Sequence, residues 1–124
     1  MISVIWQKNT RNNEWFDFLR LDLNAPYFTG RRGVFVIWYT GTGVGRIVKV
    51  GSGNIAEQLN LMRSNPLVLE FSRKGTLKVS WVSINGAIKE SDILGVQAFL
   101  ADTYNPVLGD RPGADPIQVN LIGR

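Results

Sequence analysis

The pattern of hydrophobic residues along the chain predicts three strands. Residues 34–39 (Val-Phe-Val-Ile-Trp-Tyr) are all β-branched or aromatic, which is typical of a buried strand. Residues 46–50 form a second strand after the glycine-rich residues 40–45, and residues 77–84 alternate between apolar and polar side chains. We expect the first two strands to form a hairpin and the third to be half-buried.

A first helix is predicted after the second strand. Asn54 is a good N-cap, and the Glu57 side chain is placed to return a bond to the Asn54 backbone N–H, much as in a capping box. The sequence Ser64-Asn65-Pro66 ends this helix. Its apolar stripe consists of Ile55, Leu59 and Met62.

A second helix is predicted near the end of the chain. Either Glu90 or Ser91 is expected to cap it, and Asn105-Pro106 stops it. Its apolar stripe consists of Ile93, Val96, Leu100 and Tyr104.

Four segments are less clearly marked. Residues 3–7 alternate and are expected to form an edge strand, and residues 116–121 an extended edge segment. Residues 67–71 are compatible with a short strand or a loop. Residues 12–22 are compatible with a short helix or a covering loop, because only some of their aromatic residues stand at helical spacing.

The order β-β-α-β-α predicts a single α+β domain over residues 1–124, with a small, mostly antiparallel sheet flanked by helices. The 44% hydrophobic content is that of a folded domain, and the apolar runs are too short to span a membrane. Residues 1–8 lack the features of a signal peptide, so a cytoplasmic protein is expected.

The absence of two residue types limits the chemistry. Without cysteine there is no thiol nucleophile or zinc–thiolate site, and without histidine the commonest general base is missing. Catalysis would have to use carboxylates, Lys, Tyr, Ser, Thr or Arg. Any metal would be a hard ion held by oxygen.

The net charge of +4 is concentrated in one part of the sequence. Between residues 31 and 63, five basic residues stand against Glu57 alone, whereas the remainder has nine basic and nine acidic residues. A basic patch of this kind favours phosphate backbones, although a mildly basic solvated surface is the simpler interpretation. The five are Arg31, Arg32, Arg46, Lys49 and Arg63.

The glycines of residues 40–45 resemble a nucleotide-binding loop only superficially. They recur at every second position and lead into a strand, whereas a phosphate-binding loop opens a helix. A hairpin turn is therefore the better interpretation.

Several motifs together resemble the GIY-YIG nuclease superfamily over residues 33–106. They follow one another in the same order and at similar spacing, and residues 116–121 are also similar to one bacterial branch. The motifs are Gly33-Val34-Phe35, Lys49-Val50-Gly51, Gly53-Asn54-Ile55, the Trp81 strand and Tyr104-Asn105-Pro106.

The resemblance implies where an active site would lie. In the family, an aromatic hydroxyl on each strand, an arginine and a glutamate surround a scissile phosphate, and the glutamate holds one divalent cation. The matching positions here carry Phe35, Lys49, Gln58 and Gln97, and Met62 stands where the family often has histidine. An amide replaces a carboxylate poorly at a hard cation, so the resemblance implies a catalytically degenerate site.

Gln97 also lies within the predicted apolar stripe of the last helix. Its side chain is either a relic of the metal site facing the sheet, or a glutamine satisfied by backbone groups or placed at the rim of the core. Among the tryptophans, Trp38 and Trp81 are expected in the core, whereas Trp6 and Trp15 are open between core packing and base stacking.

The sequence is compatible with three alternative functions. The first is a nuclease-like domain that binds nucleic acid through the five basic residues without a cofactor, so that Lys49→Glu weakens binding. The second is an active Mg²⁺-dependent endonuclease with a rearranged site that uses Tyr39, Lys49 and Glu57. The third is a protein-interaction module that contacts a partner through the aromatic residues 15–19.

Overall fold

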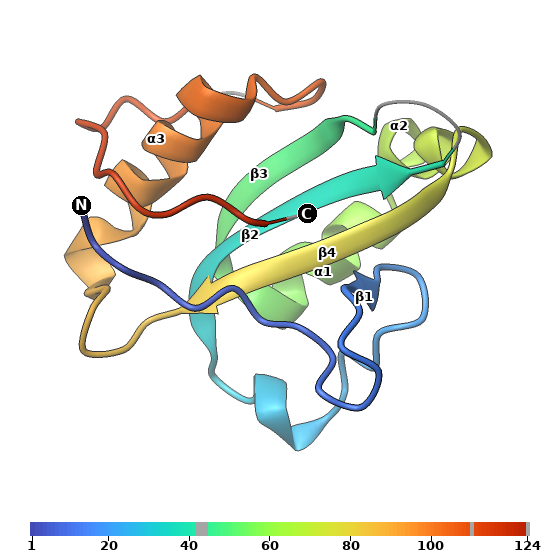
Figure 1. The fold of residues 1–124 in the computed structure, drawn as a ribbon, viewed down its shortest axis with the longest axis horizontal. Helices are drawn as coiled ribbons and strands as arrows, with labels where there is room; N and C mark the ends of the chain where they lie inside the picture. The colour runs from blue at the N-terminus through green and yellow to red at the C-terminus, as the bar shows by residue number, and fades with distance from the viewer. Residues whose placement is uncertain (42–44, 110, 124) are drawn as a thin grey trace.

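The computed structural model describes residues 1–41, 45–109 and 111–123. Within these residues a four-stranded antiparallel sheet has the strand order β1-β4-β2-β3 (Figure 1). This sheet, together with its helices, confirms the predicted α+β fold. The strands are β1 (Phe16–Asp17), β2 (Arg32–Thr40), β3 (Ile47–Asn54) and β4 (Thr76–Ser83). The helices are α1 (Ile55–Arg63), α2 (Pro66–Leu69) and α3 (Ile93–Tyr104).

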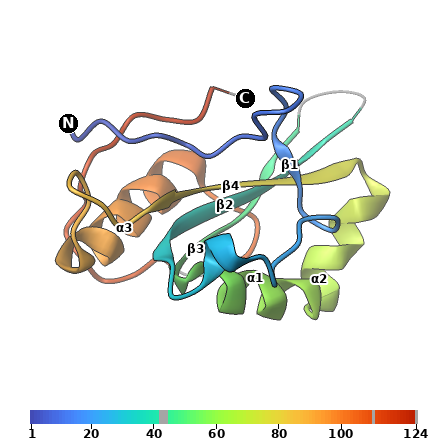
Figure 2. The same cartoon turned by 90° about the horizontal axis from the view of Figure 1, so that it is seen from below.

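Apolar residues pack on both faces of the sheet. Helices α1 and α2 cover one face, and α3 with the two chain termini covers the other (Figure 2). The central strand β2 serves both layers, since Val34, Val36 and Trp38 point toward α3 while Phe35 and Ile37 point toward α1. This explains why residues 34–39 read as a continuous apolar run.

The predicted hairpin is confirmed by the pairing of β2 with β3. Phe35 lies opposite Gly51, and the register shifts between Ile37, which pairs with Lys49, and Trp38, which pairs with Ile47. Strand β3 follows directly in the chain, in agreement with a hairpin rather than a nucleotide-binding loop. Of the predicted turn, residues 42–44 lie outside the described part of the chain.

Helix α1 begins as predicted. The Asn54 side chain accepts a hydrogen bond from the Glu57 backbone N–H at 3.0 Å. The return bond is absent among the described residues, and Glu57 is exposed.

No helix in the described part of the chain is long and apolar enough to cross a membrane.

Helix α3 buries its predicted stripe but begins differently from the prediction. Residues 90–92 form a 3₁₀ turn before α3. The Asp92 carboxylate caps this turn by accepting a hydrogen bond from the Lys89 backbone N–H at 3.2 Å. The capping roles predicted for Glu90 and Ser91 are wrong, because the Glu90 carboxylate is engaged by Arg32. Asn105 ends the helix in the left-handed conformation, with φ of 47°.

Residues 67–71 are neither a strand nor a loop, so both predicted alternatives are wrong. Pro66 starts the short helix α2, and the Asn65 side chain caps it by accepting from the Leu67 N–H at 3.0 Å. The Asn-Pro pair that ends α1 therefore also starts the next helical turn, because proline is favourable at the first helical position.

Residues 12–22 cover the sheet without forming a helix. Asn13 has a φ of 57°, which a helix interior does not allow, and residues 16–17 pair with β4. The loop alternative is confirmed and the helical one is wrong.

The two chain ends pack against each other across the α3 face of the sheet (Figure 1). Ile2 forms a parallel bridge to Val119, and the Trp6 indole donates to the Asn120 carbonyl oxygen at 2.9 Å. The tail is extended, as predicted. The edge strand predicted for residues 3–7 is wrong, because Val4 and Trp6 bond to the tail and only the end of the segment reaches the sheet, where the Gln7 N–H donates to the Trp81 carbonyl oxygen at 3.1 Å.

Candidate functional site

The four positions matched to the family's catalytic residues all lie around β3. Phe35 is fully buried, and its ring covers Gly51 so closely that a Cβ there would lie 2.6 Å from Phe35 Cε1. Gln58 reaches back over Gly53, where a Cβ would lie 3.6 Å from Gln58 Cγ. The Phe35 ring therefore faces the core and is closed to a substrate.

Lys49 lies at the outer edge of the sheet. Its strand is bordered there by the segment after α3, which donates from Val107 and Leu108 to the carbonyl oxygens of Ile47 and Val48. The Lys49 side chain runs against Gly109, where a Cβ would lie 3.0 Å from Lys49 Cδ. Lys49 is half-buried, so only part of it is available to a ligand.

Gln97 approaches β3 from the α3 side. Its amide oxygen accepts from the Ser52 hydroxyl at 2.6 Å, and its amide nitrogen donates to the Val50 carbonyl oxygen at 3.4 Å. Both halves of the amide are thus used to join α3 to β3. The sequence alone did not identify this hydrogen bond, because nothing in the spacing of Ser52 and Gln97 indicates that they are partners.

These surroundings do not fit the divalent cation that the family resemblance implies. The only acceptor that Gln97 offers is a neutral amide oxygen, which is already bonded to Ser52. A hard cation needs several oxygen ligands and usually a carboxylate. Among the described residues, no three acidic side chains gather into a metal-binding group.

Two of the three residues suggested for a rearranged nuclease site, Tyr39 and Glu57, lie at opposite ends of the sheet, and Lys49 pairs with Ile37 between them. Tyr39 is near the end of β2, where its ring stacks on Phe71 with centroids 5.8 Å apart. Glu57 is in the first turn of α1, which adjoins the start of β2 through a bond from the Ile55 N–H to the Arg31 carbonyl oxygen. The structure does not bring Tyr39 and Glu57 together.

Two of the five predicted basic residues are engaged at the start of β2. Arg32 pairs with Glu90 at 2.9 Å, and the bond to that carboxylate raises the pKa of Arg32. Arg31 donates to the Tyr27 carbonyl oxygen at 2.8 Å, and its guanidinium lies 3.8 Å from the centre of the Tyr27 ring. Glu90 offsets the charge of Arg32, whereas Arg31 forms no ion pair among the described residues.

Arg63 has a structural role. Its guanidinium donates to the carbonyl oxygens of Phe18 and Leu21, and the bond from Nη2 to Phe18 is 2.7 Å long. Burial lowers the pKa of Arg63, although an arginine remains protonated at neutral pH. The half-buried guanidinium holds the covering loop against α1.

Arg46 lies at the other end of the sheet from Arg31 and Arg32. The Arg46 carbonyl oxygen accepts a hydrogen bond from the Tyr39 N–H at 3.2 Å, so Arg46 lies beside the end of β2, where the hairpin turns. Arg32 and Tyr39 are seven positions apart on β2, so about 23 Å separates the two ends. The five predicted residues therefore do not form one patch.

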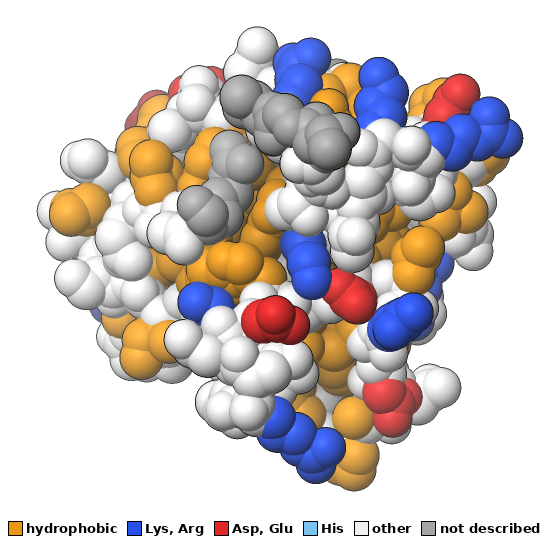
Figure 3. Space-filling model, turned by 45° about the vertical axis from the view of Figure 1, so that its right-hand side comes forward, with side chains coloured by type: hydrophobic (Ala, Val, Ile, Leu, Met, Phe, Trp, Pro, Cys, Tyr) orange, Lys and Arg blue, Asp and Glu red, His pale blue; other side chains and the backbone are white. Residues whose placement is uncertain are grey.

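Other basic residues lie at the same end of the sheet as Arg46, since Arg20 borders a hollow with Thr40 and Gly41. The backbone of Lys74 and Gly75 packs against Thr40 and Gly41, which brings the turn before β4 to the hairpin. The members are Arg20, Arg46, Arg73 and Lys74, and we call this set the hairpin-end cations. In Figure 3, which turns this end of the molecule forward, Lys and Arg side chains line the upper edge.

The hairpin-end cations are exposed and largely unpaired. Within the described part of the chain, none of them forms an ion pair, and the Lys74 ammonium lies 5.9 Å from the centre of the Phe71 ring. The nearby acids are Glu70 and Asp17, and Asp17 is bonded to Lys78 at 2.6 Å. Among the described residues, Glu70 is thus the unpaired acid on the side of the turn before β4, and Arg20 also borders the hollow beside β1 with Glu14 and Asp22. Counting charges along the sequence missed this set, because strand pairing assembles it from distant segments.

The tryptophans and the aromatic residues 15–19 pack mainly inward. Trp38 and Trp81 are buried as predicted, and Trp6 also belongs to the core. Trp15 is half-buried, with its ring 5.7 Å from that of Trp38, and Phe18 is buried. Of residues 15–19, Leu19 alone is exposed, with 49% of its surface accessible. A partner would meet little aromatic surface there.

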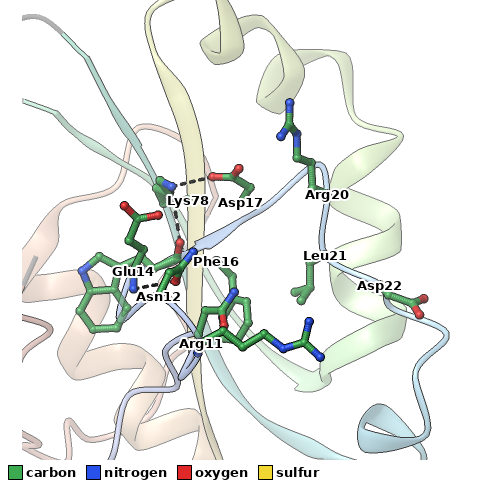
Figure 4. Close-up of a pocket in the computed structure, with 11 residues that line it drawn as sticks. Arg11, Asn12, Glu14, Phe16, Asp17, Arg20, Leu21, Asp22 and Lys78 are labelled. Atoms are coloured by element: carbon green, nitrogen blue, oxygen red, sulfur yellow. Dashed lines mark hydrogen bonds and ion pairs between the residues drawn. The ribbon is translucent and has the colours of Figure 1, made fainter.

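Three hollows lie along the covering loop. The hollow beside β1, shown in Figure 4, has a volume of about 490 Å³ and is bordered by Arg11, Arg20 and Asp22 among others. A second, of about 470 Å³, lies beside Thr40 and Gly41 at the hairpin end. A third, of about 380 Å³, is floored by aromatic rings.

Comparison with known proteins leaves the family open. No protein-family model matches the chain, and no match is found among curated proteins or solved structures. The resemblance to the GIY-YIG superfamily therefore stays a prediction from its motifs.

Proposed function

We propose that this domain binds nucleic acid at the hairpin end of its sheet and does not cleave it. The observation that supports the proposal is that Arg20, Arg46, Arg73 and Lys74 lie at the hairpin end and form no ion pair among the described residues. Exposed cations without acidic partners release counterions from a phosphate backbone when they bind it. Lys49, on the neighbouring strand, can add a weaker contact.

The absence of cleavage is proposed from the catalytic positions. Phe35 has no hydroxyl and is buried, and Gln97 uses its amide to join α3 to β3. Phosphoryl transfer needs groups that stabilise the developing charge at the phosphate. Both side chains are occupied in holding the fold together, and the other two matched positions, Lys49 and Gln58, lack the family's hydroxyl and guanidinium groups.

Binding of this kind has a steep salt dependence. Each phosphate contact contributes a slope of about −0.9 to the logarithmic salt plot, so three or four contacts predict a loss of roughly 40- to 150-fold between 50 and 200 mM salt. Little sequence preference is expected, because contacts to phosphates carry no base information.

The test is fluorescence anisotropy with labelled oligonucleotides over this salt range. Lys74→Glu is expected to weaken binding by roughly tenfold or more, since a hydrogen bond to a charged group contributes about 1.5 kcal/mol. Lys89→Glu is the matched control, because it makes the same charge change on an exposed residue at the other end of the sheet. Equal weakening by both variants, or no binding, would contradict the proposal.

A cleavage assay on the same oligonucleotides with Mg²⁺ or Mn²⁺ tests the second part. We expect no product. Cleavage that a chelator abolishes, and that is lost in Lys49→Ala or Glu57→Gln, would instead support the rearranged nuclease.

A further inference from the structure

The aromatic hollow lies between residues 7–11 and the covering loop, and apart from Trp81 its lining residues precede the region that resembles the nuclease family. Its rings form a connected array in which Phe16 stacks on Trp81 with centroids 5.2 Å apart, and Tyr27 and Phe28 border the same Trp81 ring. Because Trp81 is only 2% exposed, the array is anchored in the core. The result is a rigid, ring-lined floor.

Tyr27 leaves a hydrogen-bond donor at this hollow. Its hydroxyl accepts from the Trp81 indole N–H at 3.0 Å, while its own O–H donates to no described residue. Tyr27 is 38% exposed, and the guanidinium of Arg31 lies over one side of its ring. Lys8 and Arg11 border the hollow itself, so an entering ring would find apolar surface, two cations and a free donor together.

The three hollows follow one another along the molecule. The aromatic hollow shares Arg11, Phe16 and Asp22 with the hollow beside β1. That hollow in turn shares Asp17 and Arg20 with the hollow at the hairpin end. The three hollows are therefore neighbours along the covering loop, from the aromatic floor, past β1, to the hairpin-end cations, and we call this row of hollows the groove.

The charge along this groove favours an anionic chain. Lys8, Arg11 and Arg20 border it, and the acids beside them are Glu14 and Asp22. A further acid, Asp17, is offset by Lys78 at 2.6 Å. The groove is thus slightly basic along β1 and becomes strongly basic where it reaches the hairpin end.

We propose that this groove holds a single strand of nucleic acid, with one unpaired base in the aromatic hollow against Tyr27 and Phe16. The phosphates of the strand then pass Arg11 and Arg20 toward the hairpin-end cations. This inference rests on the proposed function and specifies its ligand. The volume of about 380 Å³ is within the range of small-ligand sites, roughly 300–1,000 Å³.

The hollow discriminates against a duplex for an energetic reason. A paired base must be unstacked and unpaired before it can enter such a hollow, whereas a base of a single strand is already free. Stacking on aromatic rings depends little on the identity of the base, so little sequence preference is expected. Single strands should therefore bind more tightly than duplexes of the same sequence.

The experiment compares three labelled probes by anisotropy: a single-stranded 12-mer, its duplex, and a 12-mer backbone that carries abasic sites. We expect the single strand to bind at least tenfold more tightly than the other two. Tyr27→Ala should weaken its binding by about 5- to 150-fold, the range measured for loss of one stacked base. A free mononucleotide added as competitor shows whether the hollow takes a nucleotide alone; displacement only by oligonucleotides supports the strand.

A second variant keeps the test valid if Tyr27→Ala unfolds the protein. Arg11 is exposed, and its guanidinium forms no ion pair or hydrogen bond with the described residues, so Arg11→Glu should weaken single-strand binding while leaving the circular dichroism spectrum unchanged. Equal binding of all three probes, with no effect of Tyr27→Ala or Arg11→Glu, would overturn this inference. If the hairpin-end variants still weakened binding, the proposed function would stand. Loss of binding to every probe would overturn both.

Discussion

The contact of Gln97 with β3 predicts how the fold responds when the family's carboxylate is restored. In Gln97→Glu, the oxygen that accepts from Ser52 at 2.6 Å is kept, but the nitrogen that donates to the Val50 carbonyl oxygen at 3.4 Å is replaced by oxygen. An ionised carboxylate cannot donate, so two acceptors would face each other in a half-buried position. We therefore expect the substitution to destabilise the protein.

The size of the effect depends on pH. When it is protonated, the introduced carboxyl can still donate to Val50, so the fold favours its neutral form and raises its pKa above the unfolded value of about 4.3. A raised pKa means that the stability is present below about pH 4 and is lost as the pH rises through the folded-state pKa. At neutral pH, leaving a buried acceptor unsatisfied costs about 1–3 kcal/mol.

The assay is urea unfolding followed by tryptophan fluorescence, at pH 4 and at pH 7.5. Gln97→Glu should match the wild type at pH 4 and fall below it at pH 7.5. Gln118→Glu is the matched control, since it makes the same change at an exposed side chain, and it should show no such difference. Full stability of Gln97→Glu at pH 7.5, or its stabilisation by Mg²⁺, would refute the reasoning and indicate an open metal site.

Two further substitutions test the packing. Gly51→Ala should destabilise the protein by about 1–3 kcal/mol, because the added methyl group overlaps the buried Phe35 ring, and Phe35→Leu in the same chain should recover part of this loss. Arg63→Met should lower the free energy of unfolding by about 1–3 kcal/mol, since it removes the bonds to Phe18 and its loop, whereas Arg73→Met on the surface should have little effect. Urea unfolding measures all four variants, and equal effects of the two arginine substitutions would contradict the role given to Arg63.

Local signals in the sequence were sufficient for the centre of the fold. The apolar run that became β2, the Asn54 cap of α1 and the left-handed Asn105 after α3 each depend on residues close to one another in the chain. Interactions of this kind can be read from spacing alone. The short helix α2 shows the limit, because its starting signal, Asn65-Pro66, was interpreted only as the end of α1.

Contacts between distant segments could not be predicted in this way. The bond from Trp6 to Asn120 draws the first residues to the tail, and nothing near Trp6 indicates that partner. Arg63 illustrates the same limit for function, since only the fold shows that loop carbonyl oxygens occupy its guanidinium. The hairpin-end cations likewise come together only because β4 returns beside β2.

The most direct test of the central claim is the anisotropy of a labelled single-stranded 12-mer with wild type, Lys74→Glu and Lys89→Glu at 50 and 200 mM salt. We predict binding that weakens steeply with salt and is reduced by Lys74→Glu while Lys89→Glu leaves it unchanged. An affinity that does not change between 50 and 200 mM salt, or that both variants reduce equally, would contradict a nucleic-acid site at the hairpin end.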